Sequence, residues 1–539
     1  MKKTIRNIIL YLLTFAFILG AFTGCAKESA TKPENLVPEY TAAVPFESHA
    51  SGGIHEGIYT IDGEKVFIGE NFINVERMKE YKEAGFDVLY ISSMGITANE
   101  DFEKSNAKKL MDTALEAGID RAILVDFYLW DMLTAKNGKM VGEGSEYLID
   151  STNFTEPEYD GDERTKEERA LDKAVWDHVK RYFYHPCFYG ISMYDEPSYK
   201  LTENFGKVYK SLRRVAEKNG KPEMTLYSNL GPLGFASTRM QENPTDFREA
   251  FTSYVENYVL ATDCDRLSVD IYAFRRQGIF AGYFQTLQIF REICSKYNVK
   301  MEYVGQSFNM FEGSLESYAF VSKSEMMYEA NVALGMGVTG YNYYTYFPDL
   351  SYSTEGIKWR ETSTFLTMDG TRNNVYYYGQ EILNYMRSFN EVISNFEYQG
   401  AKFYYTDGLP NFDNAPYRAS YIDGPTGTPV VWDNSHEFSL VKKDGDNDKV
   451  TLDNDVLFMT ELKDSKNDLY MYMLMNAIDP RNGDGGSRTD ETVSVDFGSE
   501  YGWVAEYDCG QLRYVKLNNG VYEKTLSAGY AVYLIPIKN

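Results

Sequence analysis

The chain has 539 residues, a formal net charge of −25 and 15% aromatic residues, with 45 Tyr against 5 Trp. This length exceeds one ordinary hydrophobic core and predicts roughly two or three domains. The negative charge disfavours nucleic acid and other polyanionic partners, and it favours a neutral or cationic ligand.

The amino terminus has the pattern of an export signal. Three basic residues within the first six precede an apolar run that ends at Phe22, which is too short for a stable membrane span. Residues 1–24 resemble a bacterial lipoprotein signal peptide, and the resemblance implies that Cys25 becomes the lipidated first residue. We therefore expect a protein on the bacterial cell surface, outside the cytoplasm and anchored to the membrane by lipid. Ordinary secretion with cleavage nearby is the alternative.

Residues 25–52 are polar and proline-punctuated, which predicts a tether. From residue 53 to residue 396, short apolar runs alternate with longer amphipathic stretches, as in βαβ units. The predicted strands are 57–60, 88–92, 121–128, 188–195, 224–229, 267–272, 300–306 and 338–344. Eight strands with intervening helices predict an α/β fold, a (β/α)₈ (TIM) barrel. A doubly wound open sheet is the alternative, but no glycine-rich loop follows the first strand.

Residues 397–539 lose the helical period and contain alternating runs separated by Gly, Asn and Asp. This pattern predicts a C-terminal antiparallel β-sandwich. Two acidic stretches, 444–448 and 479–490, have some features of calcium loops but lack the full ligand spacing. Since Asp, Asn and Gly are also the usual turn residues, we interpret both as hairpin turns and predict no metal site.

The fourth predicted strand ends in Tyr194-Asp195-Glu196-Pro197. Side chains alternate between the two faces of a strand, so Tyr194 and Glu196 are expected to point into the barrel. The carboxyl ends of barrel strands carry the chemistry of this fold, so Glu196 is predicted to be catalytic. The structural alternative is an Asp-Glu-Pro turn that leads into the next helix.

The same alternation predicts three more inward carboxylates, Asp126, Asp270 and Glu302. A buried carboxylate without a partner is costly, so inward acids imply water, mutual hydrogen bonds or a ligand. The structural alternatives are an arginine partner for Asp126 and a buried ion pair for Glu302. Other side chains expected at the mouth of the barrel are Trp130, Asn229, Tyr272, Gln306, Asn342 and Tyr344.

This pattern resembles the large clan of (β/α)₈ glycoside hydrolases whose fourth strand ends in Asn-Glu-Pro, with Asp195 in place of Asn. The resemblance covers residues 53–396 and implies that Glu196 donates a proton to the glycosidic oxygen. The clan supplies a second carboxylate from the end of strand seven, where this chain has Gln306. Glu302 and Asp270 are the candidates for that role, and both a retaining and an inverting mechanism stay open.

The sequence thus predicts an extracellular glycoside hydrolase that cleaves O-glycosidic bonds in a neutral oligosaccharide or polysaccharide, without a cofactor. A non-catalytic glycan-binding lipoprotein is the main alternative, because Gln306 stands where an acid is expected. A metal-dependent hydrolase is disfavoured because no His pair accompanies the acids. The predicted catalytic residues are Glu196, Glu302 and Asp270; the predicted substrate-binding residues are Asp126, Trp130, Tyr194, Asp195, Asn229, Tyr272, Gln306, Asn342 and Tyr344.

Overall fold

The chain divides into two units, residues 1–39 and 40–539, and every element below belongs to the second. The computed structural model describes residues 36–51, 58–61, 64–67, 74–92, 101–126, 129, 163–233, 247–275, 278–280, 282–312, 315–319, 321–348, 350–353, 356–362, 364–367, 369–405, 439–442, 449–452, 456–481 and 490–539. The signal peptide, Cys25, Trp130 and the acidic stretch 444–448 lie outside these residues.

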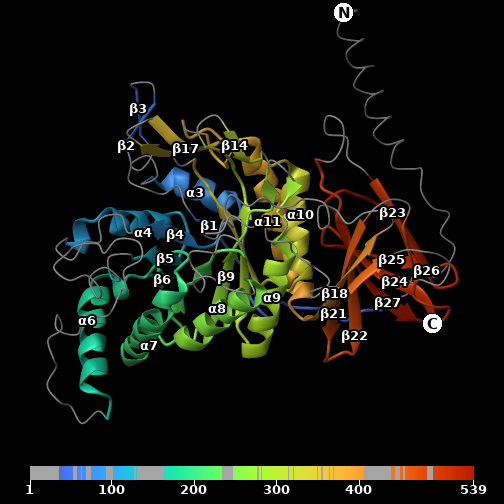
Figure 1. Cartoon of the computed structure of the whole chain (residues 1–539), viewed down its shortest axis with the longest axis horizontal. Coiled ribbons are helices and arrows are strands. Elements are labelled where there is room, and N and C mark those ends of the chain that lie inside the picture. Colours follow the sequence, from blue (N-terminus) through green and yellow to red (C-terminus); the bar gives the residue numbers. More distant parts are fainter. Residues whose placement is uncertain are drawn as a thin grey trace, which may run out of the picture. The chain divides into compact units, whose positions relative to one another are not determined.

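Two parallel sheets, β1-β15-β12-β9-β8 and β4-β5-β6-β7, lie at the centre of the barrel and together make its ring; many of their strands are labelled in Figure 1. In the described part of the chain the ring consists of β1 (Glu47–Ser51), β4 (Leu89–Ser92), β5 (Ala122–Val125), β6 (Phe188–Ser192), the split strand β7 (Thr225–Leu226) and β8 (Asn229–Leu230), β9 (Arg266–Asp270), β12 (Lys300–Gln306) and β15 (Gly340–Tyr344). β1 pairs with β15, and the backbone N–H of Val88 donates to the Ser48 carbonyl beside β4. A bridge between Asp195 and Asn229 joins the other two edges. The predicted (β/α)₈ barrel is therefore confirmed.

The first barrel strand was predicted at the wrong place. Residues 57–60 overlap β2 (Ile58–Ile61), which pairs with β3 (Glu64–Phe67) in a hairpin outside the ring. The Asp-Gly pair between these two strands is a strong hairpin signal. The true first strand, β1, lies inside the predicted tether, and its inward side chains Glu47 and His49 are polar, so no apolar run marks it.

Helices alternate with the strands along the barrel (Figure 1), and most expose one polar face. The described α-helices are α3 (Val75–Glu83), α4 (Asn106–Glu116), α6 (Lys166–Phe183), α7 (Thr202–Lys218), α8 (Phe247–Thr262), α9 (Tyr283–Tyr297), α10 (Lys323–Gly335) and α11 (Asn374–Ile393), with 3₁₀ turns at Phe102–Lys104 and Tyr199–Leu201. The helix α10 differs because nearly all its residues are buried. Of the described helices, none is long and apolar enough to cross a bilayer.

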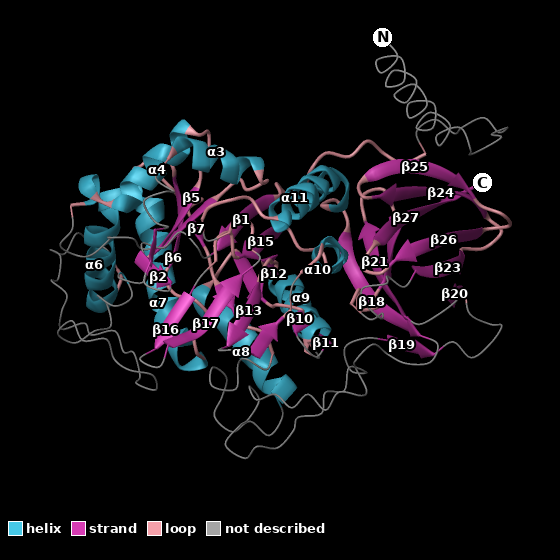
Figure 2. Cartoon of the chain, turned by 90° about the horizontal axis from the view of Figure 1, so that it is seen from above, coloured by secondary structure: helices cyan, strands magenta, loops and turns pink. Residues whose placement is uncertain are grey.

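A second sheet grows from the carboxyl ends of β9, β12 and β15, and we call it the outer sheet. Its hairpins are β10 (Phe274–Arg275) with β11 (Gly278–Ile279), β13 (Asn309–Glu312) with β14 (Leu315–Tyr318), and β16 (Leu350–Ser353) with β17 (Gly356–Thr362). Among the described residues these strands pair in the order β11-β10-β14-β13-β17-β16; all of them except β14 are labelled in Figure 2. The βα connections on one side of the barrel mouth are thus fused into one antiparallel sheet.

Two antiparallel-rich sheets follow the barrel and confirm the predicted sandwich (Figure 2). One contains β18 (Glu397–Tyr405), β19 (Ser439–Lys442), β21 (Val456–Asp464), β22 (Leu469–Asn476), β24 (Tyr501–Asp508), β25 (Gln511–Lys516) and β27 (Ala531–Lys538); the other contains β20 (Val450–Leu452), β23 (Asp490–Asp496) and β26 (Val521–Ser527). Leu474, Val493, Val504 and Val532 belong to one buried cluster between them. Such burial of aliphatic side chains is the main force that holds a sandwich together.

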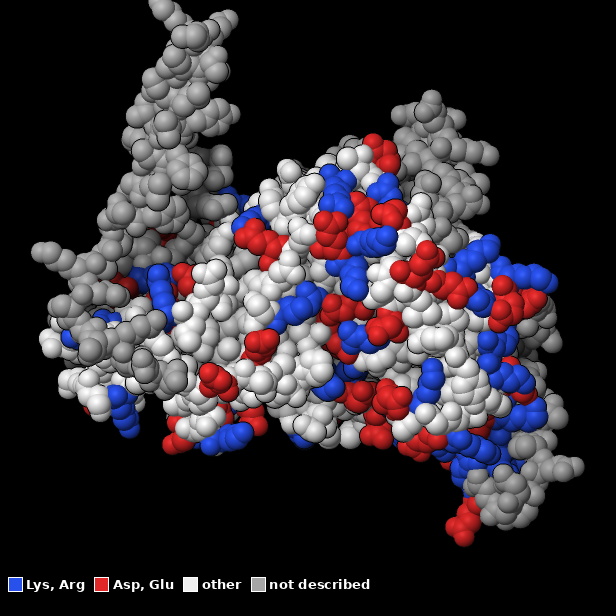
Figure 3. Space-filling view, turned by 180° about the vertical axis from the view of Figure 1, so that it is seen from behind, with Lys and Arg blue, Asp and Glu red and all other residues white. Residues whose placement is uncertain are grey.

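Acidic and basic side chains are interspersed over the face drawn in Figure 3. Many form short-range pairs along one helix, such as Lys108 with Asp112 on α4 and Lys173 with Asp177 on α6. Exposed pairs of this kind contribute about 0.3–0.5 kcal/mol each. The stability of the fold therefore depends mainly on its buried contacts.

Candidate active site

The strand register places the inward side chains of the barrel at defined depths. Glu302 lies opposite Ser268, and Val304 lies opposite Asp270, in the pairing of β12 with β9. Asp270 is the last residue of β9, at the carboxyl end of the barrel. Glu302 is four residues before the end of β12, about 13 Å along the strand from Gln306. Glu302 therefore lies too far along β12 from its carboxyl end to reach the mouth of the barrel.

Two aspartates meet at the mouth through one amide. Asn229 Nδ2 donates to Asp195 Oδ1 at 2.9 Å and to Asp270 Oδ2 at 3.0 Å. Because both acceptor oxygens bind the same nitrogen, they lie no more than about 6 Å apart. Asp195 is exposed while Asp270 is buried. The site thus presents two carboxyl groups at fixed spacing in unlike surroundings.

The environment of Asp270 favours its protonated form. Burial, followed by the negative charge of Asp195, raises the pKa of Asp270 to about 7, against the opposing effects of Tyr272, Asn229 and Arg275. Unlike surroundings that separate the pKa values of two neighbouring carboxyls are the usual way in which one becomes an acid and the other an anion. Asp270 can therefore hold a proton near neutral pH.

Glu196 lies at the same mouth, in an uncommon backbone conformation. Its φ is +43°, and its backbone N–H donates to the Asn229 carbonyl at 3.1 Å. A positive φ in a residue other than glycine is uncommon, and such conformations cluster at functional sites. The charge of Glu196 also contributes to the raised pKa of Tyr272, after burial, Asp270 and Tyr344. The structure thus brings Glu196, Asp195, Asp270 and Tyr272 together.

The position of Tyr194 differs from the prediction. β6 ends at Ser192, so the strand alternation no longer applies to the residues that follow. The ring of Tyr194 packs edge-on against Phe205 of α7 at 5.8 Å, while Asp195 reaches Asn229. Tyr194 therefore contacts the surrounding helices, and Asp195 takes the place at the mouth that the alternation gave to Tyr194.

Four aromatic rings line the side of the mouth beneath the outer sheet. Tyr272 lies 5.0 Å from Phe308, 5.7 Å from Tyr318 and 5.7 Å from Tyr344, measured between ring centroids. Burial and the charge of Asp270 raise the pKa of Tyr272 well above its ordinary value, so its hydroxyl stays protonated. Tyr272 and Tyr344 thus lie where the sequence predicted them, beside the acids.

Gln306 is buried and its amide binds backbone groups, whereas its predicted contact with substrate stays a prediction. Its Oε1 accepts from the Phe274 N–H at 2.9 Å, and its Nε2 donates to the carbonyls of Phe308 and Ala319 at 3.0 Å each. These bonds join the connections that follow β9 and β12. Gln306 therefore holds the base of the outer sheet.

Glu329 of α10, which the sequence reasoning missed, completes this arrangement. It is fully buried, and its carboxylate accepts from the backbone N–H groups of Ala273 at 3.1 Å and Gln306 at 2.8 Å. Burial raises the pKa of Glu329 to about 8 despite these bonds. The available signal was a glutamate set among apolar residues of α10 such as Met326 and Ala330.

Replacement of Glu329 by Leu is expected to destabilise the fold. The change leaves two buried backbone N–H groups without an acceptor, at about 1–3 kcal/mol each. Urea unfolding should show a lower free energy of unfolding than in the wild type, whereas Glu381→Leu, at an exposed ion pair on α11, should change little. Equal stability of Glu329→Leu and wild type would contradict the proposed anchoring.

Asp126 does not face the mouth, contrary to the prediction. It follows the last residue of β5 and is fully buried, where its carboxylate lies 2.7 Å from His178 Nε2 and accepts from the Tyr182 hydroxyl at 2.7 Å. Both partners belong to α6. Burial acts to raise the pKa of Asp126, but His178 and these hydrogen bonds lower it below its ordinary value. Asp126 thus joins the strand to its covering helix.

Asn342 also lies below the mouth, in the barrel interior. It is buried, its Oδ1 accepts from the His49 N–H at 2.9 Å, and its Nδ2 donates to the Tyr227 hydroxyl at 3.3 Å. Both ends of the amide are therefore used inside the protein. The predicted contact of Asn342 with substrate stays a prediction, and its amide binds protein groups in the structure. Asn229, which binds Asp270, lies at the mouth.

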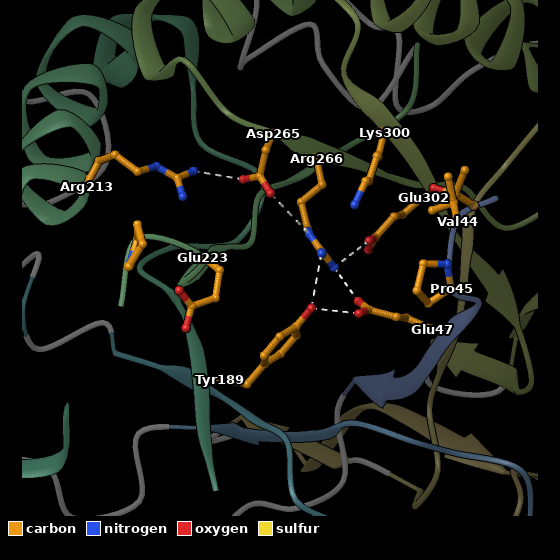
Figure 4. A pocket seen from close by; sticks show the side chains of 12 residues that line it. Val44, Pro45, Glu47, Tyr189, Arg213, Glu223, Asp265, Arg266, Lys300 and Glu302 are labelled. Carbon is orange, nitrogen blue, oxygen red and sulfur yellow. Dashed lines mark hydrogen bonds and ion pairs between the residues drawn. The ribbon is translucent and has the colours of Figure 1, made fainter. Parts of the chain in front are cut away.

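Glu302 belongs to an ion network at the opposite, amino end of the barrel (Figure 4). Arg266 Nη1 donates to Glu302 Oε1 at 2.9 Å and to Glu47 Oε2 at 2.5 Å, and the Tyr189 hydroxyl donates to Glu47 Oε1 at 2.6 Å. These residues line a cavity of about 510 Å³ at that end. The structural alternative, a buried ion pair, is what the structure contains, so Glu302 cannot assist Glu196 or Asp270.

Within the described residues, no group of three His, Cys, Asp or Glu side chains has the arrangement of a metal site. Trp130 lies outside the described residues, and its predicted role as a sugar platform stays a prediction.

Comparisons with known proteins give remote structural likenesses only. No family model and no curated protein sequence matches the chain. A GH27 β-L-arabinopyranosidase from Geobacillus stearothermophilus aligns over 92% of this chain and 96% of its own, at 10% identity and a TM-score of 0.46. An Anoxybacillus α-amylase aligns over 86% and 90%, at 10% identity and a TM-score of 0.42. A GH99 endo-α-mannosidase from Bacteroides thetaiotaomicron aligns over 63% and 91%, at 11% identity and a TM-score of 0.35. Similarities at this level assign neither a family nor an activity to the chain.

Proposed function

We propose that the chain is a retaining glycoside hydrolase that acts outside the cell, with Cys25 as its lipid anchor. The observation that carries the proposal is the pair Asp195 and Asp270, held by the single amide of Asn229. Two oxygens bound to one nitrogen lie within about 6 Å of each other, a range that includes the separation of about 5–5.5 Å that retaining glycosidases need. The membrane location rests on the sequence pattern around Cys25 alone.

In the first step, Asp270 donates its proton to the glycosidic oxygen as the bond to the leaving group breaks. The carboxylate of Asp195 attacks the anomeric carbon and forms a covalent glycosyl ester. In the second step, Asp270 is a carboxylate and removes a proton from water, which displaces Asp195 and restores both groups. Each sugar thus leaves with the configuration it had in the substrate.

Tyr272, which follows β9, and Glu196, which follows β6, lie beside the pair Asp195 and Asp270. The Tyr272 hydroxyl remains protonated and can donate to a sugar oxygen or to the ester oxygen of Asp195. The half-buried rings of Tyr272 and Tyr344 offer apolar surface for a sugar ring, and the buried ring of Phe308 packs against both. We assign Glu196 to substrate hydroxyls, although the sequence resemblance implies that it is the proton donor.

The direct test is a screen of aryl glycosides and oligosaccharides for release of sugar, followed by NMR of the first-formed anomer. Hydrolysis with retention supports the proposal, and inversion contradicts it. The matched control for Asp270→Asn is Asp265→Asn. Asp265 precedes the amino end of β9, the strand that ends at Asp270, and it pairs with Arg213. Specific binding of glycans without turnover of any of them would favour the glycan-binding alternative.

The raised pKa of Asp270 sets the pH dependence of both activity and stability. We expect kcat/KM to fall as the pH rises above about 7, because Asp270 then loses the proton it donates. The free energy of unfolding should also decrease between about pH 4 and about pH 7, because only the unfolded chain releases this proton there. Urea unfolding of Asp270→Asn should lack that slope, and an unchanged slope would contradict the assignment.

A further inference from the structure

Arg275 is an arginine close to the proposed catalytic pair that forms no ion pair with the residues that the structure describes. It lies on β10, at the start of the outer sheet and five residues after Asp270. Its guanidinium lies 3.8 Å from the centroid of the Tyr318 ring and 5.4 Å from that of Phe280. Among the described residues its side chain forms no ion pair, and its buried Nε has no hydrogen-bond partner. This nitrogen is therefore unsatisfied within the part of the chain that the structure describes.

Several arginines of this acidic chain that lie near carboxylates pair with them, whereas Arg291, which forms no ion pair within the described residues, donates to Ser295 and to the Gly337 carbonyl. Arg266 pairs with Glu47 and Glu302, and Arg372 pairs with Glu80. A chain with 79 acidic and 54 basic residues offers many such partners. A guanidinium that stacks on an aromatic face and forms no ion pair within the described residues is a candidate for a ligand-binding group.

The pairing of the outer sheet fixes Arg275 beside the mouth. Arg275 lies directly opposite Tyr318 on β14, so the two side chains share a face of the outer sheet. The Tyr318 ring contacts Tyr272, which borders Asp270. Arg275 is near enough to Asp270 for its positive charge to act on that carboxyl. The guanidinium therefore lies at the rim of the site, on the side walled by the outer sheet.

We propose that Arg275 binds a carboxylate of the substrate, so that the sugar cleaved here is a uronic acid. This inference rests on the proposed glycosidase function and specifies its substrate class. The planar guanidinium presents paired N–H donors that match both oxygens of a carboxylate. Its stacking on Tyr318 orients the donors before the ligand arrives, which reduces the entropy lost on binding.

This proposal replaces the expectation of a neutral ligand, which followed from the net charge of −25. At physiological ionic strength, charges more than about 8 Å away are largely screened. The groups around the binding position therefore matter more than the total charge. A single carboxylate at Arg275 gains a charge-assisted pair, whereas a long polyanion would still be repelled by the remaining surface.

The test compares two aryl glycosides that differ only at C6, a hexuronide and the matching hexoside. We expect the wild type to prefer the hexuronide, and Arg275→Gln to lower its kcat/KM by about 100-fold while the hexoside changes by less than about threefold. Arg275→Lys keeps the charge but not the paired donors. Its kcat/KM for the hexuronide should lie between that of the wild type and that of Arg275→Gln. The control Arg213→Gln removes an arginine at the opposite end of the barrel and should leave kcat/KM unchanged for both substrates.

Equal losses on both substrates in Arg275→Gln would overturn the proposal, because they would mean that Arg275 acts only through Asp270 or the hairpin. A preference of the wild type for a 6-sulfated hexoside over the hexuronide would also overturn it. Calorimetric titration of the Asp270→Asn protein with free hexuronate gives a readout without catalysis. If Arg275→Gln abolishes hexuronate binding by this protein, the result supports the carboxylate site. If the wild type hydrolyses none of these glycosides, that result refutes the glycosidase proposal but not the carboxylate site.

Discussion

Asp270→Asn is expected to lower kcat for an unactivated glycoside by about 10²- to 10⁴-fold, the usual contribution of a general acid. The asparagine keeps the size of the side chain and offers Asn229 an oxygen acceptor in place of Asp270 Oδ2, so the fold should be retained. It cannot donate the proton that the leaving group needs. Steady-state kinetics on the glycoside found by the screen would measure the loss.

The leaving group distinguishes this role from a general loss of structure. The dinitrophenolate of a dinitrophenyl glycoside leaves without protonation, so the first step, formation of the glycosyl ester, should survive in Asp270→Asn. In the second step, added azide should replace water as the nucleophile. Glu196→Gln should cost less than Asp270→Asn and should show no azide rescue. The reverse order of effects would transfer the proton-donor role to Glu196, as the sequence resemblance implies.

Arg266→Met is expected to lower the free energy of unfolding by roughly 3–5 kcal/mol, since it leaves buried acids without their cation. The side chain of Arg266 is 6% exposed, and its carboxylate partners Glu47 and Glu302 are 16% and 5% exposed. Burial acts to raise the pKa of Glu47, but Arg266 and Tyr189 hold it below its ordinary value. Without the guanidinium, the ionised forms of Glu47 and Glu302 near pH 7 lie in a buried site with no cation beside them, which destabilises the folded state.

The sign of the pH dependence follows from this. In Arg266→Met the folded pKa values of Glu47 and Glu302 rise, so the deficit in stability should be small near pH 4 and grow as the pH rises towards 7. Urea unfolding at several pH values would measure it. Lys296→Met, at a pair where the lysine is 62% exposed, is the control and should cost less than about 1 kcal/mol at any pH. A deficit that shrinks with rising pH would contradict the role given to the network.

The sequence predicted the barrel and the inward direction of Asp270 because regular parallel strands obey a strict alternation. Ser268 and Asp270 face inward on β9, as expected, since that strand is continuous to its end. The alternation failed where strands stop early: β6 ends at Ser192, and Asp126 lies just past β5. Beyond a strand end, local turns and neighbouring helices decide where a side chain points.

Other features depended on contacts between distant parts of the chain. The link from Asn229 to both aspartates joins residues 34 and 41 positions apart, and no local pattern predicts it. Glu302 was given the right face of β12 but the wrong end of the barrel, because the alternation reports the face and not the depth. The outer sheet was missed because its hairpins are separated along the chain and are recognised only once their strands pair.

The most direct test of the central claim is to trap the glycosyl-enzyme with a 2-deoxy-2-fluoro glycosyl fluoride of the sugar that the protein hydrolyses, and to map the labelled peptide by mass spectrometry. The paired aspartates at the mouth of the barrel predict an ester on Asp195. A label on Glu196 or on any other residue would contradict the account, as would inactivation that leaves the protein unlabelled.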